Sequence, residues 1–237
     1  MEQIMKFDGK MKAVTFSYDD GVTQDLRVIE MLNRYGMKGT FNLNFGGLGT
    51  RYSGMIEDTF VYRDKVFARD VKTVYEGHEV ASHTLNHPDL TKCDEERIIY
   101  QVEEDRKRLS ELVGYDIVGF AYPCGYVDDR VVNIIKEKTG VKYARKVELT
   151  EKFDPPKDLF RLECTTRNFG DRFLTLAEEF VNLKPEKPQI FSVWGHAYEF
   201  DWKRNWHIFE EFCKIISGHD DIFYGTNSEV FLGVKNQ

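Results

Sequence analysis

The feature that most constrains the fold of this chain is an alternation of short apolar segments and longer amphipathic ones along most of its length. The apolar segments are rich in residues that favour strands, and the amphipathic segments have helical spacing. The predicted strands cover residues 12–17, 38–44, 78–82, 116–121, 142–144, 159–164, 189–194 and 221–224. The predicted helices cover residues 23–35, 67–75, 94–113, 128–138, 171–183 and 202–216. About seven strand–helix repeats predict an α/β fold with a parallel sheet and helices outside it.

No flexible linker, change of composition or internal repeat divides the chain, so we expect residues 1–237 to form one domain. A chain of this length can bury a sizeable core as a single α/β barrel. Residues 51–65 follow neither a helical nor a strand period, and we expect them to form an insertion or a hairpin.

The charge and cysteine content exclude several classes of partner. The formal net charge of −7 argues against binding to nucleic acid or to an anionic membrane, because both require clustered Lys and Arg. The four cysteines show no Cys-x-x-Cys spacing, which suggests free thiols in a reducing compartment. The N-terminus carries no apolar signal segment, and no apolar run approaches membrane-spanning length. We therefore expect a cytoplasmic protein, and the sequence leaves a homo-oligomer open.

Polar clusters fall just after several of the predicted strands. They are Asp19-Asp20, the segment 83–87, the segment 122–125, Arg145 and His196. In a closed α/β barrel, catalytic groups gather on the loops that follow the C-terminal strand ends. We therefore expect these five clusters to meet on one face of the barrel.

Two of these clusters have the composition of a metal site. His83 and His87 are four residues apart, and we interpret them as projecting from one side of a helical turn, where one ion can contact both rings. A carboxylate from Asp19-Asp20 would complete a two-His, one-carboxylate set with open positions for water and substrate. The second carboxylate would remain free to act as a base, so the pattern indicates a metal-assisted hydrolase.

Four motifs then occur in an order that resembles the polysaccharide deacetylase family, the NodB-type carbohydrate esterases. They are residues 15–21 (TFSYDDG), 82–87 (SHTLNH), 120–125 (FAYPCG) and 194–196 (WGH), and the resemblance extends from about residue 12 to 224. It implies a distorted (β/α) barrel with about seven parallel strands. It also implies a hydrolase that uses zinc or another divalent metal to remove acetyl groups from an N-acetylated or O-acetylated sugar or small glycan.

The resemblance also implies a role for each matching residue. Asp20, His83 and His87 would hold the metal, with zinc as the expected ion. Asp19 would be the general base, and His196 the general acid. The backbone of Tyr122, Pro123 and Cys124 would help to bind the oxyanion. Trp194 and the aromatic residues near His196 would stack on a sugar ring, although core packing explains at least one of these tryptophans equally well.

The chain departs from the family pattern at the place of an arginine that orients the base, which here is Ala121. Arg145 either replaces that arginine by pairing with Asp19 or is an ordinary surface residue. The fourth motif of the family, with its Asp and Trp, is not recognisable. These departures leave two alternatives: a barrel-sharing hydrolase of a non-sugar amide or ureide, with or without a metal, and an inactive carbohydrate-binding member. The insertion at residues 51–65 favours a partly covered pocket for a small substrate, or else extends an open groove.

Overall fold

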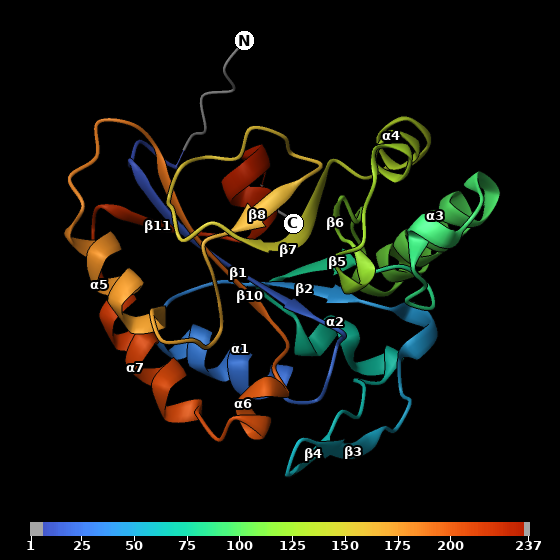
Figure 1. Cartoon of the computed structure of the whole chain (residues 1–237), viewed down its shortest axis with the longest axis horizontal. Helices are drawn as coiled ribbons and strands as arrows, with labels where there is room; N and C mark the ends of the chain where they lie inside the picture. The colour runs from blue at the N-terminus through green and yellow to red at the C-terminus, as the bar shows by residue number, and fades with distance from the viewer. Residues whose placement is uncertain (1–6, 235–237) are drawn as a thin grey trace.

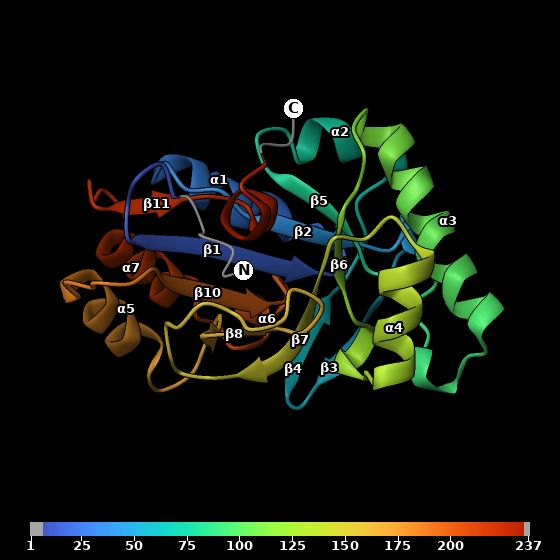
Figure 2. The same ribbon diagram turned by 90° about the horizontal axis from the view of Figure 1, so that it is seen from above.

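The structure, a computed structural model, describes residues 7–234, and its centre is a sheet of parallel strands. The strand order is β8-β7-β6-β5-β2-β1-β10-β9, with β11 added beside β1, and the helices lie around the sheet (Figures 1 and 2). The strands of this sheet are β1 (Lys12–Asp19), β2 (Thr40–Leu43), β5 (Glu79–Ser82), β6 (Gly119–Ala121), β7 (Tyr143–Leu149), β8 (Leu162–Cys164), β9 (Thr166–Arg167), β10 (Gln189–Gly195) and β11 (Ile222–Tyr224). The α-helices are α1 (Asp25–Arg34), α2 (Val71–Val74), α3 (Glu95–Val113), α4 (Asp129–Lys138), α5 (Phe173–Asn182), α6 (Glu199–Trp202) and α7 (Trp206–Ile216).

The two ends of the sheet meet at Thr165, which separates β8 from β9. β8 pairs with β7, and β9 pairs with β10. The N–H of Thr165 donates to the carbonyl of Ser192 in β10 at 2.9 Å. Because β8 and β9 are separated by one residue and lie at opposite ends of the strand order, the sheet curls into a nearly closed barrel. It has seven strands when β8 and β9 are counted as one interrupted strand, with β11 outside. The predicted distorted barrel is therefore confirmed.

β1 is the central strand, and all eight of its residues are buried. Its apolar residues Val14, Phe16 and Tyr18 alternate with the buried polar residues Thr15, Ser17 and Asp19. Because successive side chains of a strand point to opposite faces, the two sets lie on opposite faces of the sheet. On one edge, β10 pairs with almost the whole of β1. On the other, β2 pairs only with residues 17–19, which leaves room for β11 beside residues 12–14.

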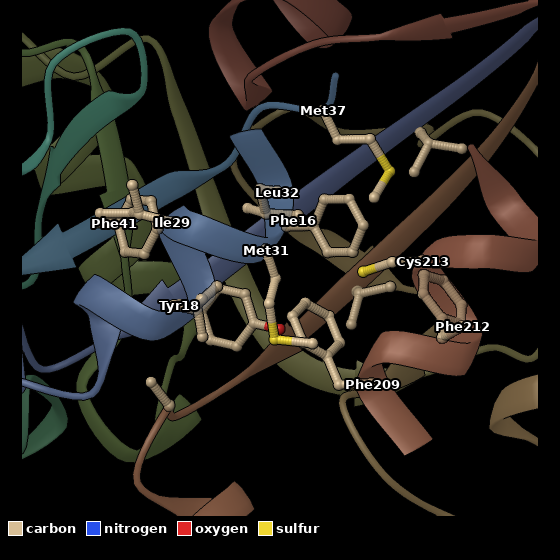
Figure 3. Close-up of a cluster of buried hydrophobic side chains, with 14 of the residues drawn as sticks. Phe16, Tyr18, Ile29, Met31, Leu32, Met37, Phe41, Phe209, Phe212 and Cys213 are labelled. Atoms are coloured by element: carbon tan, nitrogen blue, oxygen red, sulfur yellow. The ribbon is translucent and has the colours of Figure 1, made fainter. Parts of the chain in front are cut away.

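The main hydrophobic core lies between the sheet and helices α1, α5 and α7. Phe16 of β1 meets Phe209 and Phe212 of α7 edge-to-face, with ring centroids 6.2 and 6.0 Å apart (Figure 3). Phe212 also stacks on Phe173 of α5 at 4.2 Å. These contacts fix the helices against the strands whose far ends carry the candidate site.

Residues 51–65 form the predicted hairpin. Its strands, β3 (Ser53–Ile56) and β4 (Thr59–Tyr62), pair antiparallel and project from the barrel near α6 (Figure 1). The N–H of Thr23 donates to the carbonyl of Asp64 at 2.7 Å, which attaches the hairpin to the loop after β1. The hairpin therefore lies on the face where that loop leaves the barrel.

Two predicted helices differ in the structure. The helix predicted from residue 202 begins at Trp206 as α7, and Trp202 instead ends the separate turn α6, because Arg204 between them has a left-handed φ of 53°. The helix predicted over residues 67–75 is a 3₁₀ turn (Ala68–Asp70) followed by the single turn of α2. Within residues 7–234, no helix has the length and apolar character needed to cross a membrane.

Candidate active site

The candidate site lies at the C-terminal ends of β1, β5 and β10. Asp19 is the last residue of β1, His83 follows β5 directly, and His196 follows β10. Because the strands are parallel, these ends share one edge of the barrel. The polar clusters therefore meet on one face, as the sequence predicts.

Asp20, His83 and His87 come together in space, and one ligand atom from each lies within 4.8 Å of the others. The two imidazole rings are 4.7 Å apart. The predicted helical turn is wrong, however. Residues 83–87 form an irregular loop in which Thr84 and His87 have left-handed φ angles of 66° and 55°.

Hydrogen bonds stabilise the loop conformation that replaces the predicted helical turn. The side chain of Asn44, which follows β2, donates from Nδ2 to the carbonyls of His83 and Thr84, the latter at 2.9 Å. The N–H of His87 donates to Thr84 Oγ1 at 3.0 Å. A left-handed conformation disfavours residues that have a Cβ, so these bonds offset part of that cost.

His83 is prepared to act as a metal ligand. Its Nδ1 lies 2.8 Å from the carbonyl oxygen of Ala121, so Nδ1–H donates there and leaves the lone pair on Nε2 free. Burial is the main cause that lowers the pKa of His83, to about 4. The ring is therefore neutral at neutral pH, which is the form that binds metal.

Asp20 lies among positively charged and imidazole groups. Lys65 Nζ donates to the carbonyl of Asp20 at 2.7 Å and lies 3.4 Å from its Oδ1. Burial alone would raise the pKa of Asp20, but Lys65, followed by His196 and the two histidines of the loop, lowers it well below its ordinary value. An ionised carboxylate beside two imidazoles is a donor set that fits a divalent metal ion.

Asp19 is 2% exposed and receives two hydrogen bonds on the same oxygen. Arg145 Nη2 and Asn42 Nδ2 both donate to Oδ1, the latter at 2.8 Å. Burial alone would raise the pKa of Asp19, but Arg145, followed by His83 and His196, lowers it below its ordinary value. Asp19 is therefore ionised, with Oδ2 left free of these two donors.

Arg145 is buried, at 2% exposed, and is not a surface arginine. It lies in β7, directly beside Ala121 of β6 in the strand register. Its Nε also donates to Ser17 Oγ at 3.2 Å. The guanidinium thus reaches Asp19 from the strand next to the position where the family arginine is expected.

His196 has a carboxylate partner that the sequence analysis missed. The N–H of His196 donates to Glu199 Oε2 at 2.9 Å, and its Nδ1 lies 3.4 Å from Oε1. Burial alone would lower the pKa of His196, but Glu199 raises it above its ordinary value. Arg167 donates to Glu199 Oε1 at 2.7 Å and holds this carboxylate in place. The available signal was the position of Glu199, three residues after His196 in a polar loop.

The predicted oxyanion segment retains one free backbone donor. The N–H of Tyr122 donates to the carbonyl of Arg145 at 3.0 Å, and Pro123 has no N–H. Within residues 7–234, the N–H of Cys124 has no backbone acceptor. The Tyr122 side chain also points away, because its hydroxyl donates to the carbonyl of Phe160 at 2.9 Å. Of the three predicted residues, only Cys124 can therefore offer a backbone hydrogen bond to an oxyanion.

The aromatic residues near His196 divide into two groups. Trp194 is 6% exposed, and its ring lies 5.2 Å from the guanidinium of Arg145, which it supports from within the barrel. Trp206 is also buried. Tyr198 is partly exposed, with its ring centroid 5.0 Å from that of His196. Tyr198 is thus better placed than Trp194 to meet a substrate.

A family model described as polysaccharide deacetylase matches residues 6–144 of the chain. Among curated proteins, the peptidoglycan-N-acetylglucosamine deacetylase PgdA of Listeria monocytogenes is 25% identical over 126 residues. That match covers 52% of this chain and 24% of PgdA. The chain thus spans only a part of the first relatives that it matches.

Solved structures share the fold over nearly the whole chain. The Xyl-CE4 domain of a multidomain xylanase from the hindgut metagenome of Trinervitermes trinervoides has a TM-score of 0.59 at 19% identity, covering 94% of this chain and 92% of that one. A family 4 acetyl xylan esterase from Clostridium thermocellum, solved with a cobalt ion, has a TM-score of 0.56 at 16% identity, covering 94% of this chain and 93% of that one.

Proposed function

Because the chain belongs to the polysaccharide deacetylase family, we propose that it is a metal-dependent hydrolase that removes acetyl groups from an N-acetylated sugar or glycan. The observation that carries this proposal is the convergence of Asp20, His83 and His87 within 4.8 Å, with Asp19 adjacent in the chain. His196 Nε2 lies 3.9 Å from Asp20 Oδ2, so a candidate base and a candidate acid flank the same three ligands.

Asp20, His83 and His87 would hold the metal, and zinc is the ion that we expect with one carboxylate and two imidazoles. A divalent ion there supplies Lewis-acid polarisation of the acetyl carbonyl and acidifies water. The free Nε2 of His83 and the lowered pKa of Asp20 support this assignment, because neither ligand has to lose a proton at neutral pH.

Asp19 would take the proton from the attacking water. Arg145 and Asn42 hold its Oδ1, which leaves Oδ2 as the acceptor. In this proposal Arg145 has the orienting role, because it fixes the carboxylate and keeps it ionised without occupying the second oxygen.

His196 would protonate the leaving amine. Its Nδ1 faces Glu199, so a protonated ring directs Nε2–H towards Asp20 and the bound acetamide. Glu199 acts as a positioning residue, because it holds the backbone of His196 and favours the protonated form of its ring. The N–H of Cys124 would donate to the oxyanion as charge develops on the acetyl oxygen.

The test is acetate release from N-acetylglucosamine oligomers and from acetylated xylan, measured with metal-loaded and with chelated protein. We expect release from an N-acetylated oligomer by the loaded protein, loss after chelation, and recovery when the ion is restored. His87→Ala should stay inactive at the same metal concentration. Activity that is unchanged by chelation would favour the metal-independent alternative, and no release from any acetylated sugar would overturn the proposal.

A further inference from the structure

The residues that follow β4 place the guanidinium of Arg63 near the candidate acid, His196. The N–H of Val66 donates to the carbonyl of Gly21 at 2.9 Å, and Lys65 Nζ donates to that of Asp20 at 2.7 Å. These bonds attach residues 63–66 to the loop that carries Asp20. Arg63 therefore has a defined position relative to the site.

Arg63 belongs to a row of planar groups that begins at His196. The ring of Tyr198 lies 5.0 Å from that of His196, and the guanidinium carbon of Arg63 lies 5.5 Å from the Tyr198 ring centroid. The same carbon also lies 4.1 Å from the ring centroid of Tyr52. Tyr52 is 56% exposed, so the row leads from the candidate acid out to solvent along the hairpin.

The guanidinium of Arg63 has no anionic partner in the described part of the chain. It forms no ion pair there, and its buried Nε has no hydrogen-bond acceptor. A buried polar N–H without a partner is unfavourable, and a planar guanidinium is suited to bind a carboxylate through two parallel hydrogen bonds. Contacts with the rings of Tyr52 and Tyr198 restrict the guanidinium and reduce the entropy that such binding would cost.

We propose that Arg63 binds a carboxylate on the sugar unit next to the one that is deacetylated, with Tyr52 stacked beside that unit. The substrate class is then an acidic N-acetylated oligosaccharide, and the inference rests on the proposed function of the site. Arg63 can balance one negative charge, as on a carboxylate, but not the two charges of a phosphate dianion. The site already holds Asp19, Asp20 and Glu199, which would repel the extra charge. The hairpin therefore extends the binding surface beyond a single sugar.

The test compares three tetrasaccharides of equal length: the neutral N-acetylglucosamine tetramer, an alternating glucuronate–N-acetylglucosamine tetramer, and an alternating N-acetylmuramate–N-acetylglucosamine tetramer. The two acidic probes distinguish a carboxylate on the ring from one on a lactyl ether. We expect the wild type to prefer at least one acidic probe. Arg63→Met should lower the ratio of kcat/KM on that probe to kcat/KM on the neutral one by about tenfold or more, mainly through KM.

Arg27→Met is the matched control. Arg27 also stacks on an aromatic ring, 4.3 Å from that of Trp206, and removing it changes the net charge equally. This variant should retain the wild-type ratio, and Arg63→Lys should fall between the wild type and Arg63→Met because an ammonium cannot bind in the bidentate manner. A ratio that Arg63→Met leaves unchanged, or a wild type that prefers the neutral probe, would overturn the inference.

Calorimetric binding of the same tetrasaccharides separates this inference from the proposed function. If the wild type releases no acetate from any probe, the proposed function fails, yet tighter binding of an acidic probe that is lost in Arg63→Met would still support Arg63 as its ligand. If acetate is released and both kinds of probe bind equally well to both proteins, only the assignment of Arg63 fails.

Discussion

At the scale of single residues, Asp19 carries the most demanding role, because it must be ionised and keep one oxygen free. We predict that Asp19→Asn retains the metal and loses about 10²–10⁴ in kcat, since the amide cannot accept a proton from water. Arg145 would still find an acceptor in the amide oxygen, so the fold should persist. Metal content and kcat, measured on the same preparation, check this prediction. A near-normal kcat would show that Asp19 is not the base.

The sequence predicts the site residues that belong to a local pattern and misses those that only their contacts in the fold would reveal. Asp20, His83 and His87 are recognisable because each follows a predicted strand. Glu199 lies three residues after His196, so its position was a signal that the sequence offered without singling it out. Asn42 is an ordinary polar residue in sequence, and its contact with Asp19 depends on how β2 pairs with β1. Single-sequence patterns carry no such information.

A signal did exist for Asp105, which sequence reasoning overlooked. It lies on the buried stripe of α3 with Ile98, Val102 and Leu109, although the surrounding charges suggest a solvated face. Its carboxylate accepts hydrogen bonds from Ser82 Oγ at 2.6 Å and from the N–H of His83 at 3.3 Å. A carboxylate on an apolar stripe indicates a buried partner, here the end of β5.

At the scale of elements, the loop 83–87 depends on Asn44 for its shape. We predict that Asn44→Ala weakens the binding of a divalent ion by about tenfold, because residues that orient metal ligands typically contribute that much. Asn182→Ala is the control, since the Asn182 side chain also donates to a backbone carbonyl but lies on the exposed face of α5. Competition calorimetry with a chelator measures both. Equal affinities in the two variants would contradict the role of Asn44.

The elements themselves were largely predictable, and the exceptions have local causes. The long helix α3 matches the predicted range of residues 94–113. The Asp94 side chain accepts from the N–H of Arg97 at 2.8 Å at its start, and Gly114 ends it in a left-handed conformation. By contrast, the His-x-x-x-His spacing fits a helical turn equally well, and tertiary hydrogen bonds such as those from Asn44 specify a loop. The spacing therefore predicted that the two histidines come together but not the conformation of their backbone.

At the scale of the whole molecule, Asp25 links stability to pH. Burial is the main cause that raises the pKa of Asp25 from 3.8 to about 8, although Tyr75 donates a hydrogen bond to it at 2.8 Å. Between these two pH values the folded protein keeps a proton that the unfolded chain releases. This group therefore makes the free energy of unfolding fall as pH rises, by up to about 1.4 kcal/mol per pH unit.

We predict that Asp25→Asn removes this contribution. The free energy of unfolding of the variant, relative to that of the wild type, should therefore increase as pH rises from about 4 to about 8. Denaturant unfolding at a series of pH values measures the difference, with a variant of the exposed Asp171 as the control. If the free energy of unfolding depends on pH in the same way for Asp25→Asn and the wild type, Asp25 titrates alike in the folded and unfolded protein.

The closure of the barrel also belongs to this scale. Alternating strands and helices predict the parallel sheet, but the meeting of its two ends at Thr165 arises from strand order, which no local pattern contains. The same closure brings β7 round to β1, so that Arg145 reaches Asp19 across 126 positions of sequence. The orienting arginine could therefore be suggested from the sequence but not established.

The most direct test of the account is the metal content and location in protein equilibrated with zinc. We predict one ion per chain and an anomalous diffraction peak at the zinc edge that lies in contact with Asp20, His83 and His87, with both lost in His87→Ala. A stoichiometric ion bound elsewhere, or a His87→Ala protein that retains the ion at full affinity, would contradict the metal site on which the proposed chemistry depends.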